Sequence, residues 1–361
     1  MDVHAIRLES PSQQAGSHHL TSDESNGDIS HSSSCQRKGN NMSEHIPGDQ
    51  GVPVKREDAF MPGRIGFIGV GHMGQPMARN LLKSGFELRV YDLHPEQAAS
   101  LVALGAHQAF HLSDVAAPGG VVITMVPDDH ALEEVVLSEG GILEQLGANG
   151  IHLSMSTVSP QAAERFAALY AKQGSCYLAA TVLGRPDVAA AAQLSIFLAG
   201  PCAAKERVLP LLQVLGKDIY DVGEAVAAAN VVKIAANFLI VAAIEAMGEA
   251  AALVERYGLN RAQFLHMMVA SPLFGGAVYE GYGRMIGENQ YEPALFPVPL
   301  GLKDVDLVLS TAAAMYVPVP LASVAREHLL RAIEEGWAAH DWSVLARVIA
   351  TEARLPAEVH A

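Results

Sequence analysis

The chain has 361 residues, of which 50% are hydrophobic, and a formal net charge of -15 at pH 7. This length suggests two domains with a sizeable core, whereas the acidic balance argues against a nucleic-acid partner, because neutralising phosphates requires clustered lysine and arginine. With no secretion signal and no apolar run of about 18 residues, the sequence predicts a cytoplasmic protein without a membrane partner.

Residues 1–62 are rich in Ser, Gln, Asn, Gly and His and have almost no apolar periodicity. Such a segment buries too little apolar surface to offset the entropy lost on ordering. We therefore predict a disordered tail, within which Met42 and Met61 are alternative starts.

Residues 63–222 alternate between short apolar runs and helical patterns. Strand 64–69, helix 76–84 and strand 86–91 form a βαβ unit, and further strands are expected at 120–125, 150–153 and 194–199, with a helix at 160–173. This alternation predicts an α/β, Rossmann-type doubly wound sheet, mostly parallel, with helices on both faces.

Residues 223–361 read as an all-helical domain that begins with a long interdomain helix over 225–257. That helix is apolar almost all round, so it belongs in a core or an oligomer interface. We therefore expect a homodimer or homotetramer.

The segment 69–74, GVGHMG, fits the pattern GxGxxG between a strand and a helix. The first glycine permits a tight turn, the second lets the backbone approach a pyrophosphate, and the third allows close packing of helix on strand. Asp92 follows the second strand, where a carboxylate accepts from ribose hydroxyls and repels a 2′-phosphate. The expected cofactor is NAD; NADP remains an alternative, because His94 could accommodate the phosphate.

Residues 66–81, GFIGVGHMGQPMARNL, resemble the opening of the β-hydroxyacid dehydrogenases, the family of 3-hydroxyisobutyrate dehydrogenase. The resemblance extends from about Gly63 to Val348. It implies an enzyme that transfers a hydride between nicotinamide and a small 3-hydroxy acid or its semialdehyde.

Four further segments resemble the family. Residues 125–127, MVP, resemble its loop along the cofactor, and residues 154–160, SMSTVSP, resemble its DxSTxxP segment with Ser154 in place of Asp. Residues 233–237, KIAAN, resemble its KxxNN catalytic helix, and residues 302–307, LKDVDL, resemble its C-terminal KDL segment. With the glycine turn, the expected cofactor contacts are Gly69, Gly71, His72, Met73, Gly74, Asp92, Met125, Val126, Pro127, Thr157 and Lys303.

Residues 179–185, AATVLGR, align with the family's DAPVSGG substrate segment and depart from it. Leu183 replaces the serine and has no hydroxyl to offer, whereas Arg185 replaces the last glycine with a cation able to bind a carboxylate through two hydrogen bonds. A small carboxylate is the expected substrate, with contacts from Ser156, Val182, Leu183, Gly184 and Arg185.

Lys233 and Asn237 are the expected catalytic residues. Their i,i+4 spacing places both side chains on one face of an apolar helix. Lys233 would relay the hydroxyl proton, because desolvation moves its pKa toward the working range. Asn237 would hydrogen-bond the hydroxyl or the lysine, keeping the reacting atoms aligned.

Two alternatives remain open. A reductase of short semialdehydes, glyoxylate or imines would keep the cofactor and change the substrate, although imine-reducing relatives generally lack the catalytic lysine. A non-catalytic dinucleotide-binding module is disfavoured by Lys233, Asn237 and Lys303. No metal site is expected, because the cysteines and histidines lack metal-ligand spacing.

Overall fold

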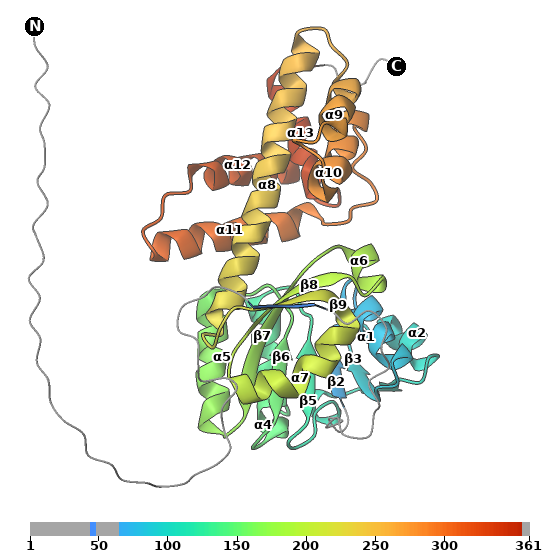
Figure 1. Ribbon diagram of the computed structural model, residues 1–361, viewed down its shortest axis with the longest axis vertical. Coiled ribbons are helices and arrows are strands. Elements are labelled where there is room, and N and C mark those ends of the chain that lie inside the picture. The colour runs from blue at the N-terminus through green and yellow to red at the C-terminus, as the bar shows by residue number, and fades with distance from the viewer. Residues whose placement is uncertain (1–43, 48–64, 356–361) are drawn as a thin grey trace, which may run out of the picture. The chain divides into compact units, whose positions relative to one another are not determined.

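The computed structural model describes residues 44–47 and 65–355 (Figure 1). Most of the predicted tail, together with Gly63 and Arg64, therefore lies outside the described residues. Within the tail the structure describes only strand β1 (Glu44–Pro47), which the sequence did not predict and which pairs antiparallel with β9 (Gly216–Asp221).

The described residues form a nine-stranded sheet in the order β1-β9-β8-β7-β6-β5-β2-β3-β4. Strand β2 pairs in parallel with both β3 and β5, so the strand order reverses beside it. Ligands of doubly wound sheets bind at the carboxyl ends of the strands at such a switch point. The strands are β2 (Ile65–Ile68), β3 (Leu88–Tyr91), β4 (His107–Gln108), β5 (Val121–Thr124), β6 (Ile151–Ser154), β7 (Cys176–Leu183) and β8 (Leu194–Ala199).

Helices cover both faces of the sheet, as the sequence predicted. Phe67 and Ile68 are neighbours in β2 but belong to separate hydrophobic cores, because successive side chains of a strand point to opposite faces. Phe67 packs with α1 (Gly74–Lys83), α2 (Ala99–Val102), α6 (Pro186–Ala190) and α7 (Cys202–Leu215). Ile68 packs with α3 (Asp129–Leu137), α4 (Ile142–Leu146) and α5 (Pro160–Lys172). Short 3-10 turns η1 (Pro95–Ala98) and η2 (Leu112–Asp114) complete this region.

Strand β7 is the main element of the sheet that the sequence analysis missed. Its sequence, CYLAATVL, contains two adjacent alanines and lacks the run of β-branched and aromatic residues that marks a strand. It is a strand because it pairs with β6 on one side and β8 on the other, which its local sequence does not predict. β8 runs antiparallel to β7, so the sheet is mostly but not wholly parallel.

The remaining chain is helical and packs around Trp342, which is buried. The close approach of α13 to α8 requires a glycine, because a Cβ atom at Gly248 would lie 3.0 Å from the Cα atom of Ala346. The helices are α8 (Ala227–Arg256), α9 (Arg261–Ala270), α10 (Ala277–Glu288), α11 (Val298–Ala314), α12 (Pro320–Glu334), η3 (Trp342–Val344) and α13 (Leu345–Glu352).

Helix α8 is long and apolar enough to cross a membrane by length and composition alone. Lys233, Asn237 and Glu245 are nevertheless buried against protein, as in the core helix of a globular domain. On its other face, Leu239 is 70% exposed and Leu253 is 72% exposed. The single chain therefore covers only part of the apolar surface of α8.

Candidate active site

The turn between β2 and α1 requires glycine at two positions and is open at a third. Gly69 has φ +87°, and a Cβ atom there would collide with the carbonyl oxygen of Met125. A Cβ atom at Gly74 would collide with the carbonyl oxygen of Gly69, whereas one at Gly71 would meet nothing within 4 Å. The open backbone at Gly71 is what a pyrophosphate needs in order to approach.

Helix α1 begins at Gly74, directly after this turn, and has no acidic residue in its first turn. Free N–H groups and the positive end of the helix dipole favour a phosphate at such a position. His72 is exposed on the turn, whereas Met73 packs partly against the core. These features fit a bound dinucleotide.

Asp92 ties the end of β3 to the glycine turn. Its Oδ2 atom accepts a hydrogen bond of 2.8 Å from the backbone N–H of Val70, and its Oδ1 atom accepts one of 2.9 Å from the backbone N–H of His94. The carboxylate is thus fixed beside the turn and also caps the segment that follows it.

The loops after β5 and β6 are joined to each other. The backbone N–H of Val126 donates a 2.7 Å hydrogen bond to Oγ of buried Ser156. Asp129 accepts hydrogen bonds from the backbone N–H and the hydroxyl of Ser159, at 2.8 and 2.5 Å. Met125 is half-buried and Pro127 is exposed at the same edge of the sheet. Two of the segments expected to contact the cofactor are therefore held together at this edge.

A buried polar cluster joins α8 and α11 to this surface. Asn237 Nδ2 donates to Asp304 Oδ2 at 2.5 Å. The other carboxylate oxygen of Asp304 lies 2.8 Å from Lys303 Nζ, which also donates to the carbonyl oxygen of Thr157 at 3.0 Å. The structure thus brings together four residues from three segments that are distant in sequence.

Lys233 belongs to the same cluster. Burial lowers the pKa of its amine from 10.5 to about 8, while the negative charge of Asp304 raises this pKa and the positive charge of Lys303 lowers it. An amine with a pKa near 8 exists in both protonation states close to neutral pH. It can therefore accept or donate a proton without a large energetic cost.

The predicted substrate segment lies at the end of β7. Gly184 has φ +149°, and a Cβ atom there would lie 2.7 Å from Leu194 Cδ2, so the chain can turn at this point only with glycine. Val182 is buried and Leu183 is half-buried. Arg185 precedes α6 and is half-exposed, with its Nε atom 3.5 Å from Asp187 Oδ1.

Three residues of this region were not identified from sequence. Asp304 is the carboxylate shared by Asn237 and Lys303, and its only local signal is its position next to Lys303. Thr181 Oγ1 donates to the carbonyl oxygen of Ala229 at 2.8 Å, and Asn230 Nδ2 donates to the carbonyl oxygen of Val158 at 3.1 Å. These two bonds fasten the start of α8 to β7 and to the loop after β6, which fixes where Lys233 lies.

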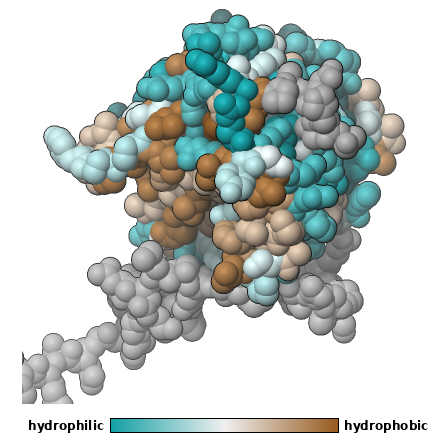
Figure 2. Space-filling model, turned by 90° about the horizontal axis from the view of Figure 1, so that it is seen from above, coloured by the Kyte–Doolittle hydropathy of each residue, from teal (hydrophilic) through white to brown (hydrophobic). Residues whose placement is uncertain are grey.

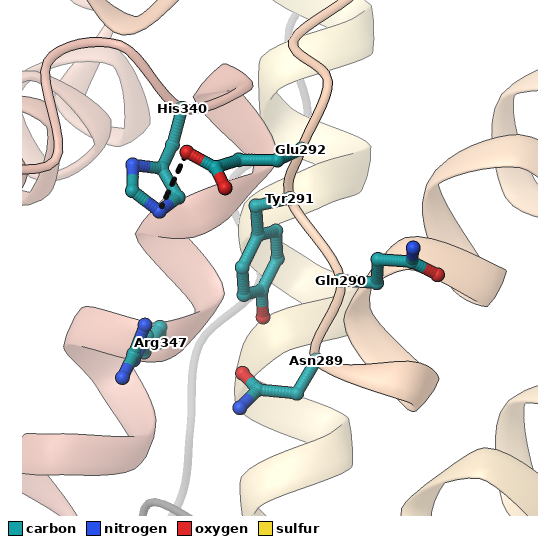
Figure 3. Close-up of a pocket in the computed structure, with 6 residues that line it drawn as sticks. All are labelled: Asn289, Gln290, Tyr291, Glu292, His340 and Arg347. Carbon is teal, nitrogen blue, oxygen red and sulfur yellow. Dashed lines mark ion pairs between the residues drawn. The ribbon is translucent and has the colours of Figure 1, made fainter.

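A cavity of about 350 Å³ lies elsewhere, in the helical region, where His340 Nε2 is 3.7 Å from Glu292 Oε1 (Figure 3). None of its lining residues is among the predicted site residues; they are Asn289, Gln290, Tyr291, Glu292, His340 and Arg347. Across residues 44–47 and 65–355, no group of three His, Cys, Asp or Glu side chains is placed to hold a metal ion.

Two family models match the chain in consecutive blocks. Residues 64–223 match the NAD binding domain of 6-phosphogluconate dehydrogenase. Residues 227–349 match a domain described as the NAD-binding of NADP-dependent 3-hydroxyisobutyrate dehydrogenase.

Relatives match over most of their length. The uncharacterized oxidoreductase YfjR of Bacillus subtilis is 45% identical over 286 residues, which are 79% of this chain and 99% of YfjR. An NAD-dependent L-serine dehydrogenase of Pseudomonas aeruginosa is 32% identical over 291 residues, which are 79% of this chain and 97% of that protein. The crystal structure of 3-hydroxyisobutyrate dehydrogenase from Salmonella typhimurium superposes with a TM-score of 0.71 at 26% identity, covering 79% of this chain and 99% of the other.

Proposed function

The chain belongs to the 3-hydroxyisobutyrate dehydrogenase family of NAD(P)-dependent oxidoreductases, and we propose that Lys233 moves the proton of its reaction. Enzymes of this kind transfer a hydride between nicotinamide and the CH–OH carbon of a small hydroxy acid or the corresponding semialdehyde. The observation that carries the proposal is a buried amine with a pKa near 8, beside Asp304 and Lys303.

In the oxidative direction, neutral Lys233 accepts the hydroxyl proton while the carbon gives up its hydride. In the reductive direction, the protonated amine returns that proton to the carbonyl oxygen, so one group serves as base and as acid. The bound nicotinamide supplies the hydride acceptor or donor.

Asn237 lies one helical turn after Lys233 and is held by Asp304, so its amide is fixed in the same cluster. A fixed Asn237 amide would align the substrate hydroxyl with the Lys233 amine, which lowers the entropic cost of reaching a reactive geometry. Lys303 adds positive charge beside Thr157, which favours the negative end of a substrate or the cofactor.

The glycine turn, His72, Met73 and residues 125–127 would hold the cofactor, with Thr157 and Lys303 toward its nicotinamide end. We propose that NAD is preferred over NADP, because Asp92 places a carboxylate where a 2′-phosphate would lie. Ser156 and residues 182–185 would contact the substrate.

Lys233 also helps to choose between the alternative functions, namely reduction of other substrates and a non-catalytic dinucleotide-binding role. Short semialdehydes and glyoxylate need the same proton transfer and remain candidate substrates. Imine reduction is disfavoured, because imine-reducing relatives generally lack this lysine, and a non-catalytic dinucleotide-binding role would leave a buried amine without use.

We further propose two domains, a Rossmann domain over 63–222 and a helical domain over 223–361, in a cytoplasmic homodimer or homotetramer. Leu239 and Leu253 on α8 support the oligomer, because exposed apolar surface is favourable to bury. Figure 2 shows apolar surface among hydrophilic side chains on the face viewed. Light scattering that reports a monomer would remove the oligomer from the proposal.

Replacing Lys233 with methionine tests the catalytic assignment. Turnover should fall by about 10²- to 10⁴-fold, because general acid–base catalysis contributes that much, while the dissociation constant for NAD should change little. Lys217→Met, at an exposed lysine of β9, is the matched control. Turnover of the Lys233 variant near that of the control would refute the assignment.

A further inference from the structure

Arg185 reaches from the α/β region to the helical region. Its backbone is fixed by the turn at Gly184, which only glycine can adopt without a clash. Its Nη1 atom lies 3.0 Å from the point where a Cβ atom on Gly281 of α10 would be. The guanidinium therefore rests against the backbone of a helix that is remote in sequence.

Within residues 65–355, Asp187 is the one side chain that accepts a hydrogen bond from this guanidinium. Its contacts to Asp187 are both 3.5 Å, at the outer limit for a hydrogen bond. The two side chains are 38% and 64% exposed, and an exposed pair of this kind contributes little. Arg185 can therefore exchange Asp187 for a carboxylate at shorter distance with little loss of stability.

Leu183 adds a second observation. It lies two residues before Arg185 at the end of β7, and its side chain offers no hydrogen-bond donor to a substrate. Arg185 is the one charged side chain of residues 179–185. A guanidinium can bind a carboxylate through two parallel N–H donors.

We propose that Arg185 determines specificity for substrates with a free carboxylate, and that Gly281 is a positioning residue that sets how far the guanidinium reaches. This inference rests on the proposed function of the site. The substrate class is a short 3-hydroxy acid in its anionic form, rather than its ester or amide.

The first test compares 3-hydroxyisobutyrate with its methyl ester, using NAD. Arg185→Gln should lower kcat/KM for the acid by about 10- to 100-fold, mainly through KM, because a charge-assisted hydrogen bond is lost. The ester should lose far less, and Arg185→Lys should restore part of the acid's rate, since it keeps the charge but not the planar fork. Equal losses for acid and ester would overturn the proposal.

The second test uses two glycines of α10. A methyl group at Gly281 must displace Arg185 Nη1, a flexible atom, so Gly281→Ala should fold normally and raise KM for the acid several-fold. Gly283→Ala is the matched control, because its Cβ atom would lie 3.7 Å from Met247 Sδ, an ordinary contact. Identical kinetics for the two variants would remove Gly281 from the proposal.

Failure of this inference is distinguishable from failure of the catalytic assignment. Lys233→Met should lower the turnover of acid and ester alike, by about 10²- to 10⁴-fold, whereas Arg185→Gln should lower that of the acid far more than that of the ester. If neither compound is turned over, the role of Arg185 is tested by calorimetry, which measures the binding of 3-hydroxyisobutyrate to the protein–NADH complex. Weaker binding in Arg185→Gln supports the proposal, and equal affinity, or no binding to either protein, contradicts it.

Discussion

The side-chain amide of Asn237 donates to the carboxylate of Asp304, so a residue of α8 and a residue of α11 meet in one buried cluster although they are 67 positions apart. Lys303 pairs with the other oxygen of the same carboxylate. The negative charge of Asp304 therefore lies beside both Lys233 and Lys303. Removing this charge should change the pKa of Lys233 in a predictable direction.

Asp304→Asn should move the pH–rate profile to lower pH. The negative charge of Asp304 raises the pKa of Lys233 against the larger effect of burial, so its loss lowers that pKa below about 8. Oxidation requires the neutral amine, and its rate rises with pH as the amine deprotonates. Measuring kcat/KM for oxidation between about pH 6 and pH 10 checks this; a profile unchanged or moved upward would contradict it.

Lys303→Met should move the same profile in the opposite direction. The positive charge of Lys303 lowers the pKa of Lys233, so a neutral side chain at 303 lets that pKa rise. The rise in oxidation rate then occurs at higher pH than in the wild-type protein. Lys217→Met serves as the control for loss of one positive charge, and an equal displacement in both variants would count against the local effect.

Gly71→Ala and Gly74→Ala should separate cofactor binding from folding. At Gly71 a Cβ atom meets no protein atom within 4 Å, so the variant should melt at nearly the wild-type temperature and bind NAD at least about tenfold more weakly. At Gly74 the Cβ atom collides with backbone, so melting should occur at lower temperature even without cofactor. Thermal melting and NAD titration together test both; normal NAD affinity in Gly71→Ala would refute the role of that position.

Asp92→Asn should shift the cofactor preference toward NADP. An asparagine still offers an oxygen to the backbone N–H of Val70, so the glycine turn is retained, while the charge that repels a 2′-phosphate is removed. The ratio of kcat/KM with NADP to kcat/KM with NAD should rise by about tenfold, equivalent to about 1.4 kcal/mol. A wild-type protein that prefers NADP would show that Asp92 only caps its own turn.

His152 should make the protein less stable in acid. It is buried, its pKa is lowered by that burial to about 3, and it contacts Thr124 Oγ1 at 2.9 Å. Because the unfolded chain binds this proton below about pH 6.5 and the folded chain does not, stability falls as pH falls from about 6.5 toward 3. The slope from this one residue approaches about 1.4 kcal/mol per pH unit.

Urea unfolding at pH 7 and pH 5 measures this slope. His152→Gln removes the titrating ring and keeps a neutral polar side chain, so its stability should depend less on pH than that of the wild-type protein. The raised pKa of His328, bonded to Glu245, acts in the opposite direction and is unaffected by the substitution. The same pH dependence in both proteins would exclude His152 as a cause.

The sequence predicted those parts of the molecule that depend on local pattern. The βαβ unit from β2 to β3 and the long helix α8 follow from periodicity and from glycine spacing, and the structure confirms them within a few residues. Strand β7 was missed because its pairing partners, rather than its alanine-rich sequence, make it a strand.

The site divides in the same way. Lys233 and Asn237 were predicted because they share one helix, where spacing determines the face. Asp304 and Gly281 were not predicted, because the contacts of Asp304 with α8 and of Gly281 with Arg185 are contained in no local pattern. Long-range packing therefore supplies the information that motif spacing lacks.

The two lysines of the buried cluster both follow residue 226, whereas the glycine turn precedes β3. A nascent chain synthesised as far as Asp221 thus already contains the whole glycine turn but neither Lys233 nor Lys303. Since chains emerge and fold from the N-terminus, the glycine turn is synthesised before either amine of the cluster, and the cluster is complete only when α11 has been made.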